Sequence, residues 1–312
     1  MRIIHIGGAK TASTSLQLGI FQNLEDVISF GEFGDGFTSK ENELIIREFL
    51  EVDSAFTSDE RFKRLVSQFS KSNNHKIIFS SADIFVARQP TMIAEKLAEI
   101  FGSDAKIILV VRNQIDCLKS FYSGHAAWLK QVPKSYFRRH VSFKSWIEFQ
   151  FLQENLKSDL KIFDYYSQIK PFINNFGEKN IIVLCYEDLI TSNPKSWKIL
   201  SELLGVEVQT LQSLFFNVNA RKRITNSKLK FVRVINFLLT LFKQSNLLDI
   251  NDFPKLDYIL NRGSRYEPKL NDDILGKINE YYGLSNSILS KTFNLDLAKH
   301  KYPNQKHDIF GE

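Results

Sequence analysis

The segment HIGGAKTASTSLQ, from His5 to Gln17, lies between a short apolar run and a helical pattern. Gly7 and Gly8 permit a tight turn. The small residues after them let backbone N–H groups approach a bound anion at the start of a helix, where the helix dipole favours negative charge. Lys10 adds a full positive charge. The segment therefore predicts a site for a phosphate or sulfate group.

The residues expected to line this site belong to the turn and the first helical residues: Gly8, Lys10, Thr11, Ala12, Ser13, Thr14 and Ser15. Their hydroxyl groups are further hydrogen-bond donors. A nucleoside triphosphatase loop requires G-x-x-x-x-G-K-[ST], but Ile4 and Ala9 stand where the two glycines belong. The Walker pattern is therefore not met. An ordinary strand-to-helix turn rich in small residues is the other interpretation of the segment.

A second motif follows about a hundred residues later, where the apolar run KIILVV ends at Arg112 and Ser120 comes eight positions on. A guanidinium group can bind a phosphate through two parallel hydrogen bonds. Eight residues are close to a whole number of helical turns, so both side chains can face one ligand. Taken alone, an arginine at a strand end is as often a structural charge.

In this order and at this distance, the two motifs resemble those of the sulfotransferases that use 3'-phosphoadenosine-5'-phosphosulfate (PAPS), and most of all their bacterial, carbohydrate-directed members. The resemblance implies that the Lys10 loop binds the 5'-phosphosulfate and that Arg112 and Ser120 bind the 3'-phosphate. Ala12 stands where the family usually has glycine. The stretch from Tyr186 to Val206 and the C-terminal stretch INEYYGLSNSILSKTFNLDL extend the resemblance over nearly the whole chain.

The alternation of β-branched runs with helical patterns predicts an α/β fold. We expect a P-loop-like parallel sheet of about four to five strands, flanked by helices and followed by a helical C-terminal part. The expected strands are 3–6, 76–80, 106–111 and 180–185. The expected helices are 14–24, 91–101, 115–128, 193–204, 228–243, 273–282 and 285–293.

Residues 1–312 are expected to form a single domain. Within it, the polar stretch 27–74 carries Gly31, Gly34 and Gly36 and is interpreted as an insertion of loop and short helices that lines a cleft. Residues 228–312 form the helical C-terminal region.

The resemblance also implies catalytic roles. Lys10 is expected to stabilise charge on the departing phosphate. Three residues are candidates for the general base: Glu32, at the position of a glutamate in heparan-type sulfotransferases; Asp83, after the second expected strand; and His125, whose ordinary pKa of roughly 6.5 suits base chemistry. Glu32 is the leading candidate, and an ordinary solvated charge is the alternative for each.

A basic cluster, Arg221, Lys222 and Arg223, lies where the family has a loop that closes over the 3'-phosphate, and we assign nucleotide binding to Arg221 and Lys222. The helix that follows, 228–243, carries an apolar stripe of Phe231, Ile235, Leu238 and Phe242 among basic residues. Burial of this stripe in a core is the first interpretation, and peripheral contact with a membrane surface is the second.

The bulk composition, with 41 Lys and Arg against 35 Asp and Glu and a net charge of +6, suits an anionic ligand and does not indicate nucleic acid. Cys117 and Cys185 are interpreted as reduced core thiols without metal-ligand spacing. The apolar strand begins almost at Met1, so no signal peptide is expected, and the predicted location is cytoplasmic.

The predicted function is sulfuryl transfer from PAPS, with 3'-phosphoadenosine-5'-phosphate (PAP) as product, to a hydroxyl or less readily an amine of a saccharide or glycolipid. No metal is expected. Two other functions stay open. One is an ATP-dependent kinase of the P-loop type, and the other is a noncatalytic nucleotide-binding or carbohydrate-binding protein with the same fold.

Overall fold

The structure is a computed structural model of the 312-residue chain. It describes these residues: 1–8, 10–31, 40–50, 60–64, 66–67, 76–86, 89–124, 141–153, 158–218, 224–241 and 254–304.

Five parallel strands form one sheet in the order β2-β3-β1-β4-β5. The strands are β1 (Arg2–Gly7), β2 (Val27–Gly31), β3 (Lys76–Ser80), β4 (Lys106–Val111) and β5 (Ile181–Cys185). Because all of them are parallel, their carboxyl ends lie at one edge of the sheet. The parallel α/β architecture predicted from the sequence is confirmed, with β1 at the centre.

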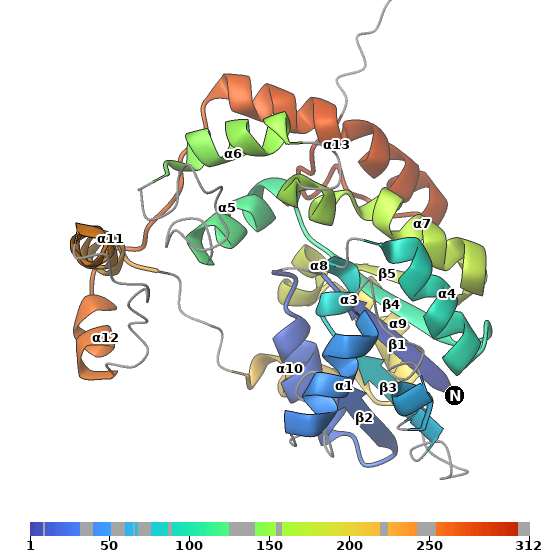
Figure 1. The fold of residues 1–312 in the computed structure, drawn as a ribbon. Coiled ribbons are helices and arrows are strands. Elements are labelled where there is room, and N and C mark those ends of the chain that lie inside the picture. Colours follow the sequence, from blue (N-terminus) through green and yellow to red (C-terminus); the bar gives the residue numbers. More distant parts are fainter. Residues whose placement is uncertain are drawn as a thin grey trace, which may run out of the picture. The chain divides into compact units, whose positions relative to one another are not determined.

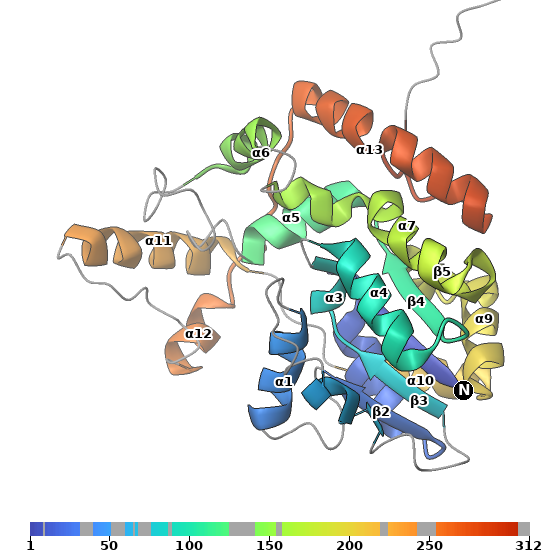
Figure 2. The ribbon, with the colours of Figure 1, turned by 45° about the vertical axis from the view of Figure 1, so that its right-hand side comes forward.

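Each strand contributes apolar side chains to both faces, as expected for a parallel sheet covered on both sides. On one face, Ile4, Phe79 and Leu109 belong to a core cluster with residues of α1, α4 and α7. On the other, Ile3 and Ile108 pack with residues of η1, α9 and α10. Figures 1 and 2 show α4 and α7 along one face of the sheet.

The described residues divide into two compact units. The first comprises Met1–Asn113, Lys161–Ala220 and Tyr282–Glu312 and contains the whole sheet. The second comprises Gln114–Leu160 and Arg221–Tyr281 and is helical. The expectation of a single domain stays a prediction.

The helices of the first unit cover the sheet. They are the π-helix η1 (Ser15–Ile20), the short 3-10 helices η2 (Phe21–Asn23), η5 (Asp159–Phe163, which begins in the second unit) and η6 (Glu178–Asn180), and α1 (Lys40–Leu50), α3 (Asp83–Val86), α4 (Pro90–Phe101), α7 (Tyr165–Phe176), α8 (Tyr186–Ile190), α9 (Pro194–Leu204) and α10 (Val208–Phe216).

The second unit holds α5 (Gln114–Gly124), α6 (Phe143–Leu152), α11 (Asn226–Leu241) and α12 (Pro254–Leu260). The long helix α13 (Asp272–Phe293) begins in this unit and ends in the first.

The interpretation of 27–74 as an insertion of loop and helix is wrong at its start, because residues 27–31 form the edge strand β2. The sequence there, VISFG, is too short and too mixed to predict a strand, but pairing with β3 supplies the hydrogen bonds and buries Phe30. The two helices expected at 273–282 and 285–293 are one continuous helix. Gly283 and Leu284, which lie between them, do not break it.

Three further helices, α6, α7 and α10, were not predicted, although each places aromatic residues in a core. Pro171 inside α7 and the short apolar spacing of α10 obscure the helical period in the sequence. Tertiary packing decides their conformation.

The predicted apolar stripe of the helix at 228–243 is not the buried face of α11. Leu229 and Val232 are buried, whereas Leu238 is 41% exposed and Phe237 is 58% exposed. The helix therefore turns a different stripe inward from the one that the spacing indicated.

Cys117 and Cys185 are both buried and form no disulfide bond, as predicted. Burial, with Asp188 and Glu187 nearby, raises the pKa of the Cys185 thiol to about 12, so this group stays protonated and unreactive. None of the described helices combines the length and the apolar character needed to cross a membrane.

Candidate functional site

The loop after β1 combines close packing with left-handed backbone. Gly7 has φ +72° and packs so tightly on Ala82 that a Cβ atom would lie 2.6 Å from the Ala82 Cα. At Gly8, a Cβ would lie 2.5 Å from the Val110 carbonyl oxygen. Lys10 and Ala12 also have positive φ, at 66° and 64°. These four residues bend the chain sharply from the strand into the helix, as the glycines predicted.

The loop is held by hydrogen bonds to the Gly8 carbonyl. The Thr11 hydroxyl donates to it at 2.8 Å, and the Ser13 hydroxyl donates at 3.4 Å. The Ser15 N–H donates to the Ala12 carbonyl at 2.9 Å. These three groups, which were expected to face an anion, therefore hold the loop in its conformation. Their contact with a ligand stays a prediction.

The helix that follows begins without a side-chain cap at Thr14. It then winds as a π-helix, η1, a conformation that is rare and occurs frequently at functional sites. The first two N–H groups of η1, those of Ser15 and Leu16, both donate to the Ala12 carbonyl, at 2.9 and 3.2 Å, so the loop backbone itself caps the helix start.

Arg112, at the end of β4, reaches the same loop. Its Nη1 donates to the Lys10 carbonyl at 2.9 Å, and its guanidinium carbon lies 4.5 Å from the ring centroid of Tyr186. The Tyr165 hydroxyl holds the Arg112 backbone, because it accepts from the N–H at 3.2 Å and donates to the carbonyl at 2.6 Å. The two motifs predicted from the sequence thus meet at Lys10 and Arg112.

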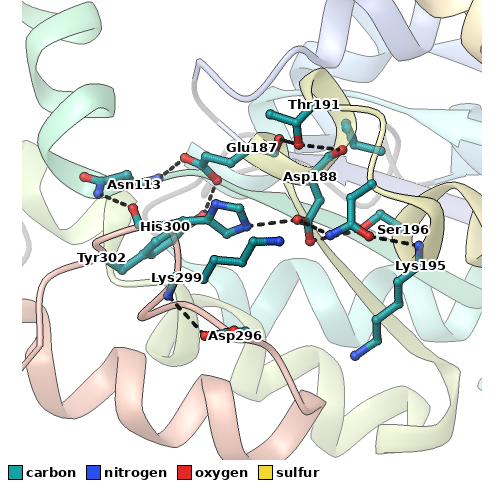
Figure 3. A network of polar contacts seen from close by, with 12 residues as sticks. Asn113, Glu187, Asp188, Thr191, Lys195, Ser196, Asp296, Lys299, His300 and Tyr302 are labelled. Carbon is teal, nitrogen blue, oxygen red and sulfur yellow. Dashed lines mark hydrogen bonds and ion pairs between the residues drawn. The ribbon is translucent and has the colours of Figure 1, made fainter.

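A polar network anchors the residue after Arg112 (Figure 3). The Asn113 N–H donates to Glu187 Oε1 at 2.9 Å, and the Asn113 amide donates to the carbonyls of His300 and Lys301. Tyr302 donates its hydroxyl proton to Glu187 Oε2 at 2.9 Å. The chain end thereby fixes the turn that presents Arg112.

The same network continues through Asp188. His300 Nε2 lies 2.9 Å from Asp188 Oδ1, and both side chains are largely buried. Asn193 and Ser196 also donate to the Asp188 carboxylate. Sequence reasoning missed the pairs of His300 with Asp188 and of Tyr302 with Glu187, because the partners are more than a hundred positions apart.

A second buried polar group lies in β1, the strand that leads into the loop. His5 is fully buried in β1, and its Nδ1 lies 2.7 Å from the Ser80 hydroxyl, which also accepts from the Gln17 amide at 3.0 Å. Ser80 thus joins His5 and Gln17 in one buried hydrogen-bond network. Burial lowers the pKa of His5 to about 3. The signal in the sequence was a histidine inside the apolar run IIHI, to which no role was assigned.

The sequence matches the family profile of the sulfotransferase domain over residues 88–234. Residues 88–234 are therefore similar to a sulfotransferase domain. The matched residues include β4, Arg112, Ser120 and β5, whereas the Lys10 loop precedes them.

Comparison with solved structures supports a sulfotransferase fold for this chain. A sulfotransferase from Alicyclobacillus acidocaldarius is similar with a TM-score of 0.54 and 13% identity, covering 96% of this chain and 98% of the other. A mouse sulfotransferase in complex with PAP reaches a TM-score of 0.44 at 12% identity, covering 93% of this chain and 88% of the other, a likeness too weak to support an inference. A search of curated proteins finds no significant match.

Of the three candidate bases in the sulfotransferase, Asp83 is described. It begins α3 as an exposed side chain, one residue after the Ala82 that packs on Gly7, and its N–H donates to the Ser81 hydroxyl at 3.2 Å. Glu32 and His125 lie outside the described residues. Glu32 directly follows Gly31, whose Cβ would lie 2.0 Å from the Ser80 carbonyl oxygen.

The remaining predicted nucleotide residues belong to the second unit. Ser120 is a half-buried residue of α5. Arg221 and Lys222 lie outside the described residues. Within the described part of the chain, no cluster of three or more His, Cys, Asp or Glu side chains could hold a metal ion.

Proposed function

We propose that this sulfotransferase moves a sulfuryl group from PAPS to a hydroxyl group, and less readily to an amine, of a saccharide or glycolipid. The observation that carries the proposal is the hydrogen bond from Arg112 to the Lys10 carbonyl. It joins the residue expected at the 3'-phosphate to the loop expected at the 5'-phosphosulfate. A nucleotide that carries both a 3'-phosphate and a 5'-phosphosulfate is the ligand that this pairing favours.

The proposed reaction is an in-line displacement at sulfur. The acceptor oxygen forms a bond to sulfur while the bond from sulfur to the 5'-phosphate oxygen breaks, and PAP leaves with the electron pair. Lys10 and the N–H groups of the loop stabilise the charge that develops on the leaving phosphate. A general base takes the proton of the acceptor hydroxyl.

Glu32 is the leading candidate for this base and Asp83 is the second. Both follow strands whose carboxyl ends lie at the edge of the sheet where β1 enters the loop. Turnover of Glu32→Gln and of Asp83→Asn at saturating PAPS decides between them. The true base should lose a factor of about 10² to 10⁴, and equal small losses in both variants would leave His125 as the candidate.

The second unit is proposed to contribute nucleotide-binding residues and to bring the protein to its acceptor. Arg221 and Lys222 are proposed to bind the nucleotide. Peripheral contact of α11 with the inner membrane surface, which would place the protein at the cytoplasmic face, is supported by the exposed Val234 and Phe237 beside the exposed Lys230. Co-sedimentation with anionic vesicles tests this contact, and its absence in wild-type protein would refute it.

Two other functions make different predictions. An ATP-dependent kinase should require Mg²⁺ and prefer ATP. A noncatalytic binding protein with this fold should bind PAP but show no turnover with any acceptor.

Calorimetry with PAP, ATP and AMP tests the proposed donor. PAP should bind about 10²-fold more tightly than AMP, because its 3'-phosphate adds charge-assisted hydrogen bonds. Arg112→Lys should weaken PAP binding about tenfold and leave AMP binding unchanged, since lysine loses both the forked geometry and the stacking on Tyr186.

Arg2→Lys is the matched control for that experiment. Arg2 also donates its Nη1 to a backbone carbonyl, that of Phe101 at 2.7 Å, but it lies at the amino end of β1. Its substitution should leave PAP binding unchanged. Stronger binding of ATP than of PAP, or equal losses in the two variants, would refute the donor assignment.

A further inference from the structure

Arg233 of α11 has a guanidinium group that forms no ion pair with a described residue. Its Nε and Nη2 atoms are buried, and no acceptor among the described residues lies within hydrogen-bonding distance of either. A buried guanidinium without an acceptor is costly, and an arginine cannot discharge by losing its proton. Such a group in a native protein requires an anion.

Two tyrosines surround this guanidinium. Its carbon lies 5.9 Å from the ring centroid of Tyr266, and the Tyr266 ring lies 6.5 Å from that of the fully buried Tyr122. The Tyr122 hydroxyl donates to the Val141 carbonyl at 2.5 Å. Burial, and next the neighbouring Tyr266, raise the pKa of Tyr122, although a side-chain hydrogen bond with Arg233 acts in the opposite direction. The Tyr122 phenol is thus a neutral partner of the guanidinium and does not supply a counter-charge.

The surrounding backbone fixes these residues. Thr225 pairs with Arg265 in an antiparallel bridge, and Tyr266 donates its N–H to the Ile224 carbonyl at 2.9 Å. The Thr225 hydroxyl accepts from the Lys228 N–H at 3.2 Å and so caps the start of α11. Tyr266 is thereby held beside the helix that carries Arg233, and the site is built within the second unit alone.

The second unit also carries the positive charge of the chain. It holds 19 of the 41 Lys and Arg residues but 11 of the 35 Asp and Glu residues. Helix α11 contains Lys228, Lys230 and Arg233 and no acidic residue. A region of this charge attracts anions before contact.

Arg233 does not belong with the predicted 3'-phosphate residue of the same unit. Ser120 and Tyr122 are two positions apart on α5, which is a rotation of about 200° around a helix. The tyrosine packed near Arg233 therefore faces away from the side of α5 that carries Ser120. The Arg233 group would serve a second anion.

We infer that Arg233, flanked by Tyr122 and Tyr266, binds an acidic group of the acceptor, a carboxylate or a sulfate of an anionic saccharide. The inference rests on the proposed sulfotransferase function for the identity of the ligand, but the anion site itself does not.

Titration of the full chain with inorganic sulfate, with saturating PAP to fill the nucleotide site, tests the anion site. Arg233→Met should weaken sulfate binding by at least about tenfold and leave PAP affinity unchanged. Arg262→Met is the matched control. Arg262 also stacks on a tyrosine, Tyr258 at 4.6 Å, but it is exposed, and its loss should leave sulfate binding unchanged. Equal sulfate affinity in wild type and Arg233→Met would overturn the inference.

Thermal unfolding without sulfate tests whether Arg233 has a purely structural role. Methionine fills a similar volume without a charge, so Arg233→Met should unfold at the same or a higher temperature than wild type, and sulfate should no longer raise that temperature. A lower unfolding temperature would mean that a carboxylate of the chain, such as Asp249 or Asp252, pairs with Arg233, and would overturn the inference.

Competition identifies the source of the anion. A hexasaccharide that contains uronic acids should displace sulfate from the PAP-bound protein, whereas the same hexasaccharide with its carboxyl groups reduced should not. Failure of both would overturn the assignment to the acceptor. If PAP itself does not bind, the proposed donor is refuted, while the sulfate titration of Arg233→Met without nucleotide still tests the anion site.

Discussion

The region around the Lys10 loop in the first unit and the α11 region of the second unit differ in how their positive charges are arranged. The first unit has 22 Lys and Arg against 24 Asp and Glu, yet it carries the predicted phosphate loop. Beside that loop, the Arg112 guanidinium donates to the backbone carbonyl of Lys10 and stacks on the ring of Tyr186, both within the first unit. The second unit is strongly basic, and its Arg233 has two buried nitrogen atoms without an acceptor.

The difference separates two kinds of anion recognition. A loop of backbone N–H groups with one lysine needs no net positive charge around it, because its donors are aimed at one place. A basic helical surface attracts anions over a distance and is weakened by salt. In this protein, the positive net charge that suggested an anionic ligand does not reside where the phosphate loop is.

Substitution of Lys10 should have the largest effect. Lys10→Ala should lower turnover about 10³-fold, because charge on the leaving phosphate loses its main neutralising group, whereas binding of the acceptor should persist. The rate of PAP formation at saturating PAPS measures this.

Lys230→Ala is the counterpart in the second unit, where the lysine is an exposed part of a diffuse field. Its turnover should stay within about twofold of wild type at saturating substrate. Comparable losses of turnover in Lys10→Ala and Lys230→Ala would contradict the distinction between a local site at Lys10 and a diffuse positive potential around α11.

The buried histidine should dominate the acid sensitivity of the first unit. The pKa of His5 is about 3 in the folded chain against 6.5 for the free group. Between these two pH values the unfolded chain binds a proton at His5 and the folded chain does not. The stabilising contribution is complete above pH 6.5 and is lost as the pH falls toward 3, by up to about 1.4 kcal/mol per pH unit.

Denaturant unfolding between pH 7 and pH 4 measures this slope. His5→Asn should flatten it, because the variant has no buried imidazole that must stay neutral in the folded chain. The comparison with Arg233 is direct: a buried imidazole gives up its charge, and a buried guanidinium cannot. An unchanged slope in His5→Asn would contradict the burial of a neutral ring.

Ala12→Gly should have the smallest effect. Ala12 has φ 64°, a left-handed conformation that costs a residue with a Cβ about 1 to 2 kcal/mol. Glycine removes this cost, but it also gives the unfolded chain more conformational entropy, which offsets part of the stabilisation. The free energy of unfolding should therefore rise by about 0.5 to 1 kcal/mol.

Chemical denaturation measures the difference, with Ala98→Gly in the middle of α4 as control. That substitution should lower stability by about 1 kcal/mol because glycine is a poor helix former. A loss of stability in Ala12→Gly would mean that the loop does not adopt the left-handed turn.

Much of the first unit could be predicted from the sequence. Four of the five strands, the loop at Gly7 and Gly8 and the strand-end position of Arg112 are encoded by short-range patterns of apolar, small and charged residues. Edge strand β2 could not be predicted, because its five residues become a strand through pairing with β3. The general base is also undecided by sequence, since three candidates share suitable chemistry.

By itself, the sequence determined the parallel α/β class, the tight turn after the first strand and the presence of one lysine and one arginine suited to phosphate groups. These features depend on neighbouring residues, whose sterics and charge act locally. The tertiary structure decided that Arg112 reaches the Lys10 carbonyl, that His5 is held neutral by burial, and that two nitrogen atoms of Arg233 are buried without an acceptor among the described residues. Each of these depends on residues far apart in the chain, and only folding sets their distance and their access to water.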